Sequence, residues 1–290
     1  MDCKVVLVQN NPALGHVRSN LEQHVASVEA AIRAGADLVV FPELSLTGYF
    51  LKDQTYELGL EPDAPLLAPL LELSKKISIS FGMVERSREQ RLYNAHVFLE
   101  QGRVLSVHRK VHLVTYGMFD ESRDFAAGDR FQFVESRLGR FGFLVCEDMW
   151  HLGGTYLHFM NDVDALIVAS ASPGRGADAS GESLASVRIW QTLLGAVSLF
   201  TQTFVLYANR VGWEDGISFS GQTCAFDPFG RRIGMLEGFD PGELAVHMRS
   251  SELQRARVTT PLRRDEKPWV LLGQLEQISG LRAKPSAERA

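Results

Sequence analysis

The feature that most constrains this chain is an apolar run that turns polar within one residue. The segment RFGFLVCEDMW (140–150) is largely apolar as far as Val145, continues with Cys146, and then carries two carboxylates. A buried strand has this pattern when its last side chain reaches the edge of a sheet. The backbone there holds a thiol rigidly while the thiol can still meet a small molecule. Cys146 is therefore a candidate nucleophile.

Two other segments share this form. The run VVFPELSLTGY (39–49) brings Glu43 out of an apolar strand, and HRKVHLVTYGMFDE (108–121) presents Lys110 and then Glu121. A lone buried charge costs several kcal/mol, so a carboxylate at the position of Glu43 is expected to be paired or functional. A thiol, a carboxylate and an amine at strand ends are the components of a thiol amide hydrolase.

The order of the predicted elements favours a single α/β domain over residues 1–290. Strand-like runs alternate with helical segments, but tight turns join several of the strands, which predicts a mixed rather than an all-parallel sheet. No Pro-, Gly- or Ser-rich linker divides the chain. The expected strands cover 4–10, 37–43, 78–86, 93–100, 103–113, 131–136, 140–146, 164–172, 204–210 and 218–228, with two more joined near residue 242, and the expected helices cover 17–34, 64–76, 154–162 and 181–201.

Composition narrows the classes of protein. The net charge of −5 argues against a nucleic-acid or acidic-membrane binder, and the basic run at 255–268 is mixed with acids and indicates a solvated or partner-facing tail. No signal peptide precedes the first strand, and the longest apolar stretch, 193–200, is far below the roughly 20 residues that span a bilayer. Three cysteines without a CxxC motif suit a reducing compartment. We expect a soluble, cytoplasmic protein with no nucleic-acid or membrane partner.

Cys146 has two competing interpretations. It could be a buried structural cysteine, as Cys3 and Cys224 are expected to be, but the polar residues 147–151 that follow it suit the rim of a cleft, Asp148 among them. It could also belong to a papain-like Cys–His pair. The histidines downstream of Cys146 are His151, His158 and His247. They are poor partners for such a pair, because His151 is too close to Cys146 in the chain and His247 lies in an apolar strand.

The run HRKVH (108–112) raises the question of a metal site. His108, Lys110 and His112 alternate, so in a continuous strand all three point to one side. The two histidines would then lie about 13 Å apart, at roughly 3.3 Å per residue, which is too far to bind one ion. No other group of His, Cys or Asp residues has the spacing of metal ligands, so we expect no metal and no cofactor.

The motifs together resemble one family. In addition to the three segments above, QNNPALGHVRSN (9–20), SASP (170–173) and ANRVGWEDGISFSG (208–221) are similar to the nitrilase, or carbon–nitrogen hydrolase, superfamily, whose catalytic residues are Glu, Lys and Cys in that order. Within it, TYGMFDE (115–121) and CEDMW (146–150) most resemble the glutaminase domain of glutamine-dependent NAD synthetase. The similarity covers nearly the whole chain.

The resemblance implies a fold, a mechanism and an assembly. The fold would be a four-layer α-β-β-α sandwich, with Glu43 as general base, Cys146 as nucleophile, Lys110 at the oxyanion, and Glu121 orienting Lys110 or the substrate amide. A homodimer or higher oligomer would form through the helices on the active-site side, including 181–201, and through the C-terminal tail 255–290. By motif position, the substrate pocket would be lined by Tyr116, Phe119, Glu147, Trp150 and Ser172.

Two departures from the glutaminase pattern affect the expected substrate. The chain ends where the ATP-using domain of NAD synthetase would begin, so we expect a free-standing protein. The basic residue expected six positions after Ser172 is replaced by Asp178, although Arg175 lies nearby and could bind a carboxylate in its place. Glu121, Glu147 and Asp178 would make the far side of the pocket acidic. We therefore expect a small ω-amide similar to glutamine rather than free glutamine itself.

Several functions remain open at this point. The expected reaction is hydrolysis of a small-molecule amide through a cysteine thioester, with release of ammonia. A nitrilase would use the same residues on a C≡N bond, and a glutaminase subunit would pass ammonia to a separate partner enzyme. A non-enzymatic binding module would be expected to lack part of the catalytic set, whereas Glu43, Lys110 and Cys146 are all present.

Overall fold

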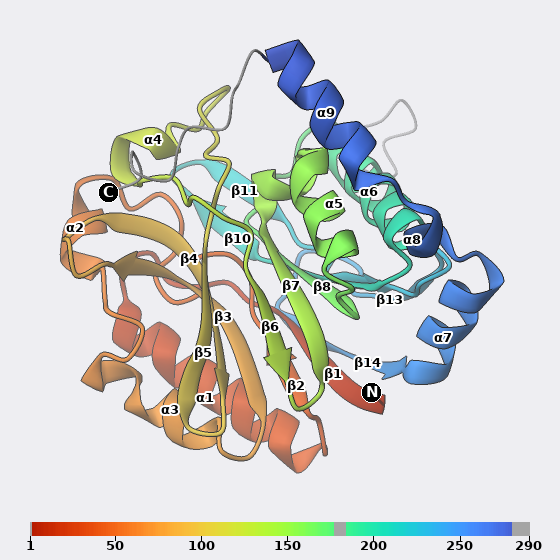
Figure 1. Cartoon of the computed structure of the whole chain (residues 1–290). Helices are drawn as coiled ribbons and strands as arrows, with labels where there is room; N and C mark the ends of the chain where they lie inside the picture. The colour runs from red at the N-terminus through yellow and green to blue at the C-terminus, as the bar shows by residue number, and fades with distance from the viewer. Residues whose placement is uncertain (1, 177–183, 280–290) are drawn as a thin grey trace.

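The structure is a computed structural model that describes residues 2–176 and 184–279. Within these residues, two larger sheets lie face to face (Figure 1). The first has the order β14-β1-β2-β3-β4-β5, with β1 Asp2–Gln9, β2 Leu38–Val40, β3 Ser78–Arg86, β4 Leu92–Glu100, β5 Arg103–Arg109 and β14 Gly242–Arg249. The second has the order β13-β12-β9-β8-β7-β6, with β6 Phe133–Ser136, β7 Gly139–Val145, β8 Ala165–Ser170, β9 Phe204–Asn209, β12 Cys224–Phe226 and β13 Arg232–Met235.

Both sheets are mixed, as the sequence predicted. Strands β1, β2 and β3 are parallel, as are β7, β8 and β9, whereas the outer strands of each sheet pair antiparallel to their neighbours. A separate hairpin consists of β10 Val211–Glu214 and β11 Ile217–Ser220. The parallel strands at the centre of each sheet direct their carboxyl ends to one edge, which is where binding sites of α/β folds form.

Helices cover the outer face of each sheet (Figure 1). The α-helices are α1 Val17–Arg33, α2 Thr55–Leu58, α3 Ala68–Leu73, α4 Glu121–Asp124, α5 Leu152–Met160, α6 Ala185–Thr201, α7 Ser250–Thr259, α8 Leu262–Asp265 and α9 Pro268–Ser279, and the 3₁₀ helices are η1 Lys52–Gln54, η2 Pro65–Leu67 and η3 Cys146–Trp150. None of the helices in the described part of the chain is long and apolar enough to cross a membrane.

The alternation of side chains along the strands produces three apolar cores. In β1, Val5 and Leu7 pack between the two sheets, against Phe141 and Ile167, whereas the intervening Val6 faces the outer helices. Leu21 and Val28 of α1 and Leu70 of α3 complete that second core. A third core joins the outer face of the second sheet to Trp190, Leu194 and Val197 of α6. The result is the expected four-layer α-β-β-α sandwich.

Several strands are shorter than predicted, and the run expected over 218–228 divides into β11 and β12. Two of these differences affect the site. The strand expected over 37–43 ends at Val40, so Glu43 lies in the loop that follows it. The strand expected over 103–113 ends at Arg109, so Lys110 and His112 lie beyond the regular pleat. The assumption that residues 108, 110 and 112 point to one side of a continuous strand is therefore wrong.

Candidate active site

Glu43 is held in a tight loop at the end of β2. The loop passes directly over Gly82 of β3, where a Cβ atom would lie 2.3 Å from the backbone nitrogen of Leu44, so only glycine fits at that position. The Glu43 carboxylate is 1% exposed and accepts hydrogen bonds on both oxygens. Asn94 Nδ2 donates to Oε1 at 2.7 Å, and the backbone N–H of Ala171 donates to Oε2 at 2.7 Å. These contacts fix the carboxylate between the two sheets.

Lys110 joins Glu43 to Glu121. Its Nζ lies 2.8 Å from Glu43 Oε1 and 2.7 Å from Glu121 Oε1, and all three side chains are buried. Glu121 also accepts a 2.9 Å hydrogen bond from the backbone N–H of Val114 and one from the hydroxyl of Tyr49. Each buried charge therefore has an opposite charge or a hydrogen-bond donor beside it, as a low-dielectric site requires.

Cys146 is positioned at a sharp turn between β7 and η3. Its φ is +46°, in the left-handed region that residues with a Cβ rarely adopt. Ser170, the last residue of the neighbouring strand β8, donates a hydrogen bond from Oγ to Cys146 Sγ at 3.4 Å. Ala171, which binds Glu43, is the next residue. One short segment thus contacts both the thiol and the carboxylate.

The charges around the thiol set its protonation state. Burial, followed by the charge of Glu43, raises the pKa of Cys146 far above its ordinary value of 9.0, and Lys110 opposes that shift only in part. Burial also raises the pKa of Glu43, which makes it a stronger base than a solvated glutamate, although Lys110 acts in the opposite direction. Burial alone would lower the pKa of Lys110, but Glu121 and Glu43 outweigh it and hold that pKa well above 10.5. The geometry therefore describes a neutral thiol beside a basic carboxylate and a permanently charged amine.

A cavity of about 330 Å³ opens in front of the thiol. It brings together Cys146 and the six residues that the sequence proposed for substrate binding, with aromatic rings forming much of the wall. Arg175 is exposed at this cavity with its guanidinium 5.4 Å from the ring centre of Phe119. Besides Cys146, the predicted residues that line the cavity are Tyr116, Phe119, Glu147, Trp150, Ser172 and Arg175.

The cavity is less acidic than the sequence suggested. Glu121 lies in the ion pair with Lys110, so its charge is compensated inside the protein. Glu147 accepts hydrogen bonds from the hydroxyl of Tyr116 at 3.1 and 3.0 Å. Asp178 falls outside the described residues. Of the two expected acids within the described residues, Glu147 lines the cavity and Glu121 does not, so the argument against a substrate with a free carboxylate is weakened.

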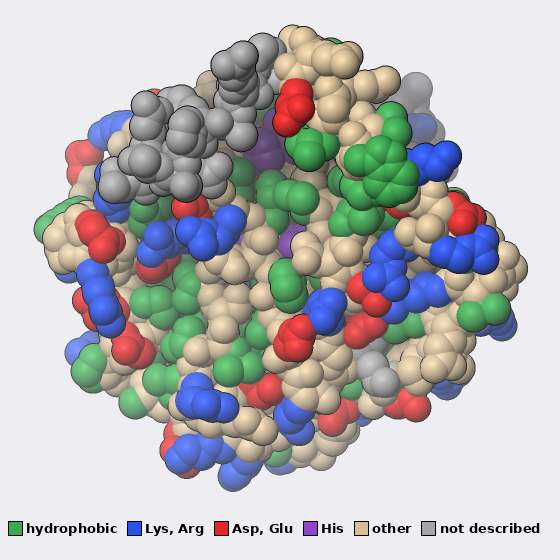
Figure 2. Space-filling model, in the orientation of Figure 1, with side chains coloured by type: hydrophobic (Ala, Val, Ile, Leu, Met, Phe, Trp, Pro, Cys, Tyr) green, Lys and Arg blue, Asp and Glu red, His purple; other side chains and the backbone are tan. Residues whose placement is uncertain are grey.

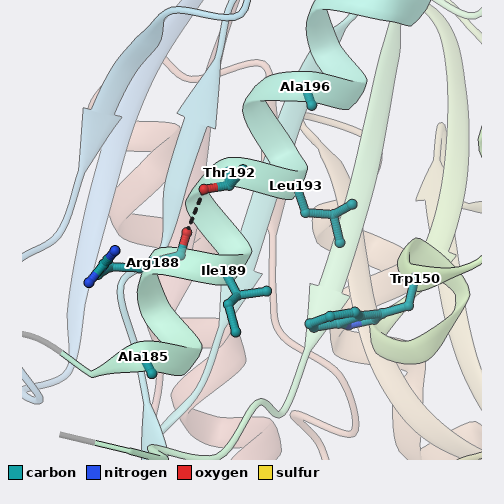
Figure 3. A pocket seen from close by; sticks show the side chains of 7 residues that line it. All are labelled: Trp150, Ala185, Arg188, Ile189, Thr192, Leu193 and Ala196. Carbon is teal, nitrogen blue, oxygen red and sulfur yellow. Dashed lines mark hydrogen bonds between the residues drawn. The ribbon is translucent and has the colours of Figure 1, made fainter. Parts of the chain in front are cut away.

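An open apolar groove adjoins the cavity on the α6 side. It has a volume of about 560 Å³ and is lined by α6 residues and by Trp150. In Figure 3 the side chains of Ile189 and Leu193 point from α6 towards the indole of Trp150. Ala185, Ile189 and Trp150 line both the groove and the cavity. The groove is therefore a continuation of the site along the surface of α6.

The histidines do not form a catalytic pair with Cys146. His151 stacks on His112 with ring centres 3.7 Å apart, and His158 Nε2 lies 3.0 Å from the carbonyl oxygen of Phe143. His247 is exposed on β14. No histidine in residues 2–176 or 184–279 has a hydrogen bond to Cys146, so the structure gives the papain-like alternative no support.

Asp148 overturns two expectations from the sequence. It is completely buried rather than at the rim of a cleft. Both His108 and His112 reach it, His108 Nε2 at 3.0 Å from Oδ2 and His112 Nδ1 at 3.1 Å from Oδ1. The premise of a continuous strand, on which the separation of about 13 Å between the two histidines rested, is therefore wrong, because the chain bends after Arg109. In the described part of the chain, no three His, Cys, Asp or Glu side chains are arranged to hold a metal ion.

Three residues that contact the reactive groups were not identified from the sequence. Tyr49 binds Glu121, Asn94 binds Glu43, and Ser170 binds Cys146. Ser170 lies in the SASP motif, and Tyr49 ends the segment that carries Glu43, so both were within reach of a pattern argument. Asn94 had a weaker signal, as an amide inside an otherwise apolar strand.

Comparison with known proteins identifies the family. A model of carbon–nitrogen hydrolases matches residues 4–258 of the chain. A glutamine-dependent NAD(+) synthetase from Acinetobacter baylyi is 31% identical over 220 residues, which cover 76% of this chain but 39% of that protein. A protein from Schizosaccharomyces pombe named "Probable nitrilase C965.09" is 26% identical over 246 residues, which cover 82% of this chain and 85% of that protein.

A solved structure agrees with these matches. A mutant of the amidase from Nesterenkonia sp. AN1, which carries the acetamide moiety of fluoroacetamide covalently added at its active-site cysteine, superimposes with a TM-score of 0.77. It is 20% identical to this chain, and the match covers 93% of this chain and 96% of that one. The chain belongs to the carbon–nitrogen hydrolase family, and it spans less than half the length of the NAD synthetase that it matches.

Proposed function

We propose that this protein hydrolyses a small-molecule amide of the ω-amide type and releases ammonia, through a thioester on Cys146. The observation that carries the proposal is the buried group of Glu43, Lys110 and Glu121, whose charges act on the thiol of Cys146, while Cys146 itself lines a cavity of about 330 Å³. A carboxylate base, a fixed cation and a thiol nucleophile are the groups that acyl transfer from an amide needs.

The first half of the proposed reaction forms the thioester. Glu43 takes the proton of Cys146 as the sulfur attacks the carbonyl carbon of the amide. The raised pKa of Glu43 favours this transfer, because it brings the basicity of the carboxylate closer to that of the thiol. Lys110 and the backbone N–H of Glu147, in the first turn of η3, stabilise the oxyanion. Glu43 then gives the proton to the nitrogen, and ammonia leaves.

The second half releases the acid. Glu43 removes a proton from a water molecule, which attacks the thioester carbonyl, and the proton returns to the sulfur as the C–S bond breaks. The sum is one amide and one water converted to one carboxylic acid and one ammonia. Glu121 keeps Lys110 in place throughout, because its carboxylate is itself fixed by Tyr49 and Val114.

An ammonia-release screen tests this proposal. The panel contains ω-amides, N-carbamoyl compounds, aliphatic amides and nitriles, with Cys146→Ala as the inactive control. With the best substrate, intact-protein mass spectrometry of the wild type quenched during turnover is expected to detect an acyl adduct on Cys146. Glu43→Gln is expected to lose ammonia release, because both halves of the reaction need the base. Absence of ammonia release from every amide, or a Cys146→Ala variant as active as the wild type, would contradict the proposal.

Two alternatives have specific support. Similarity to glutamine-dependent NAD synthetases favours a glutaminase that delivers ammonia to a partner enzyme. Similarity to a protein named as a nitrilase favours a C≡N substrate. We expect free glutamine to have a lower kcat/KM than an ω-amide without the α-carboxylate. A clear preference for glutamine that Arg175→Ala abolishes would identify a glutaminase, and turnover of nitriles alone would identify a nitrilase.

We also propose that the protein forms at least a homodimer through α6 and the C-terminal tail. Helix α6 has one apolar face against the sheet, with Leu194 and Val197 buried, and a second face where Ile189 is 48% and Phe200 is 68% exposed. Helix α9 exposes apolar side chains along its length, including Trp269 and Leu272. Figure 2 shows hydrophobic side chains at the surface in the region where α9 lies in Figure 1. Apolar helix faces of this kind are normally covered by a partner.

The oligomeric state can be measured directly. Light scattering at micromolar concentration is expected to give at least the mass of a dimer, and Phe200→Glu is expected to lower it. Trp213→Glu serves as the matched control, because Trp213 is 72% exposed but lies on the β10–β11 hairpin. A monomeric mass for the wild type would refute this proposal and leave the chemistry untouched.

A further inference from the structure

Asp148 is the most completely satisfied buried carboxylate near the site, although the proposed mechanism gives it no chemical step. Its side chain has no exposed surface, and it accepts hydrogen bonds on both oxygens. Oδ1 accepts from the backbone N–H groups of Val111 and His112 at 3.1 and 2.8 Å and from His112 Nδ1 at 3.1 Å. Oδ2 accepts from His108 Nε2 at 3.0 Å and from the backbone N–H of Val145 at 3.1 Å.

These donors come from two separate parts of the chain. His108, Val111 and His112 surround Lys110 in the sequence, at the point where β5 ends and the backbone bends. Val145 immediately precedes Cys146, and Asp148 itself follows it by two residues. A single carboxylate therefore joins the segment that carries the amine to the turn that carries the thiol. The reactive side chains do not touch Asp148, but every donor to it lies within two residues of one of them.

The contact with Val145 has a further consequence for the thiol. Cys146 has a left-handed backbone, φ +46°, which a residue with a Cβ adopts only when its surroundings enforce it. The hydrogen bond from Val145 N–H to Asp148 Oδ2 closes the turn across Cys146.

The negative charge of Asp148 strengthens these contacts. Burial opposes ionisation of Asp148, but the hydrogen bonds from His108 and His112 outweigh burial and lower its pKa far below the ordinary value. A charged acceptor makes stronger hydrogen bonds than a neutral one.

We propose that Asp148 is a positioning residue that holds Cys146 and Lys110 in the relative geometry that thioester formation requires. This inference deepens the proposed function and depends on it for the turnover measurement. Because an error of about 1 Å in the placement of reacting groups can cost 10²-fold in rate, a residue that fixes two of them together has a measurable effect on kcat.

The test compares Asp148→Asn with a matched buried carboxylate. The amide keeps one oxygen acceptor but presents N–H groups where the second oxygen accepted hydrogen bonds. Glu100→Gln is the control: Glu100 is 3% exposed and accepts from Ser78 Oγ at 2.7 Å, Ser136 Oγ at 2.5 Å and Arg137 N–H at 3.1 Å. Glu100 lies at the end of β4 away from Asn94, about 20 Å from it at roughly 3.3 Å per residue.

Three quantities are measured for each variant: the melting temperature, kcat and KM on the best amide of the screen, and the rate of Cys146 alkylation by iodoacetamide. Asp148→Asn is expected to lower kcat about 10- to 100-fold with KM within about threefold, and to change the alkylation rate. Glu100→Gln is expected to lower the melting temperature by a similar amount with kcat within about twofold. Equal effects of the two variants on kcat, at equal loss of stability, would overturn the inference.

Two outcomes need a further variant or a different measurement. If Asp148→Asn does not fold, His112→Ala decides, because this side chain is 30% exposed and supplies one of the hydrogen bonds to Asp148. Its kcat is expected to fall about three- to tenfold, and a kcat unchanged within about twofold would overturn the inference. If the wild type hydrolyses no amide, the proposed function fails, and the alkylation rates still decide whether Asp148 positions the thiol.

Discussion

Replacing Lys110 by Met measures how much the Lys110 amine stabilises the folded protein, separately from its proposed role at the oxyanion. Met has nearly the same length and no charge, so Lys110→Met leaves the carboxylates of Glu43 and Glu121 buried without their shared cation. Removing one partner of a buried ion pair typically costs about 3–5 kcal/mol, because the remaining charge stays desolvated. For a chain of this size, about 2 °C is lost per kcal/mol, so we expect the melting temperature to fall by roughly 6–10 °C.

The loss should depend on pH with a definite sign. Burial raises the pKa of Glu43 and Lys110 opposes this shift, so without the amine the Glu43 carboxylate binds a proton still more tightly in the folded protein than in the unfolded chain. The folded state then holds more protons, so the stability of the variant increases as the pH falls. In the wild type, Lys110 has a pKa raised above 10.5 in the folded state, so its contribution is fully present below that value and is lost only at higher pH. The difference between the two proteins should therefore be smaller at pH 5 than at pH 8.

Thermal unfolding followed by circular dichroism at both pH values provides the measurement. Lys75→Met is the control, because Lys75 pairs with Glu72 on the surface, with side chains 58% and 71% exposed, and such pairs contribute at most about 1 kcal/mol. Adding Glu121→Gln to Lys110→Met should recover about 1–3 kcal/mol by removing one unpaired charge, without restoring turnover. A variant as stable as the wild type, or a loss of stability that is equal at pH 5 and pH 8, would refute the account of the buried charges.

Three further predictions concern the thiol and cofactors. Cys146→Ala should keep less than about a hundredth of wild-type kcat/KM, whereas Cys3→Ala and Cys224→Ala should affect only the melting temperature; higher activity in Cys146→Ala would rule out the nucleophile. Ser170→Ala should shift the pH dependence of iodoacetamide alkylation to higher pH, because the hydrogen bond from Ser170 lowers the pKa of Cys146; an unchanged profile would mean that this contact is unimportant. Dialysis against a chelator should leave kcat unchanged, and a loss that zinc restores would contradict the metal-free mechanism.

The sequence predicted the parts of this structure whose signal is local. Each reactive residue follows a strand-like run. The period of two along an apolar strand identifies which side chains enter a core, as Val5, Val6 and Leu7 illustrate. The family motifs then supplied the number of layers, which no local pattern contains. Helix α6 belongs to the segment 181–201 that the resemblance placed at a subunit interface, and it has both a buried and an exposed apolar face.

The sequence could not predict contacts that depend on how distant segments meet. Glu43 receives Asn94 and Ala171, which are 51 and 128 residues further along the chain, and neither residue type signals such a role. The ends of β2 and β5 were also placed too late, because apolar residues still occur after the backbone has left the sheet: Phe41 follows β2, and Val111 and Leu113 follow β5. Apolarity indicates burial, and it does not distinguish a buried strand from a buried loop.

Asp148 illustrates the same limit for charged residues. Its position after Glu147, in a run of polar residues, favoured an exposed rim, since an isolated carboxylate is rarely buried. The structure buries it because all its donors except Val145 come from the end of β5 and the residues just after it, 36–40 residues earlier in the chain, where the bend after Arg109 turns His112 back towards His108. Two histidines that a straight strand would hold about 13 Å apart thus bind one carboxylate. Whether a charge near a catalytic residue is solvent-exposed or structural is decided by its partners, and those become visible only when the strands are assembled.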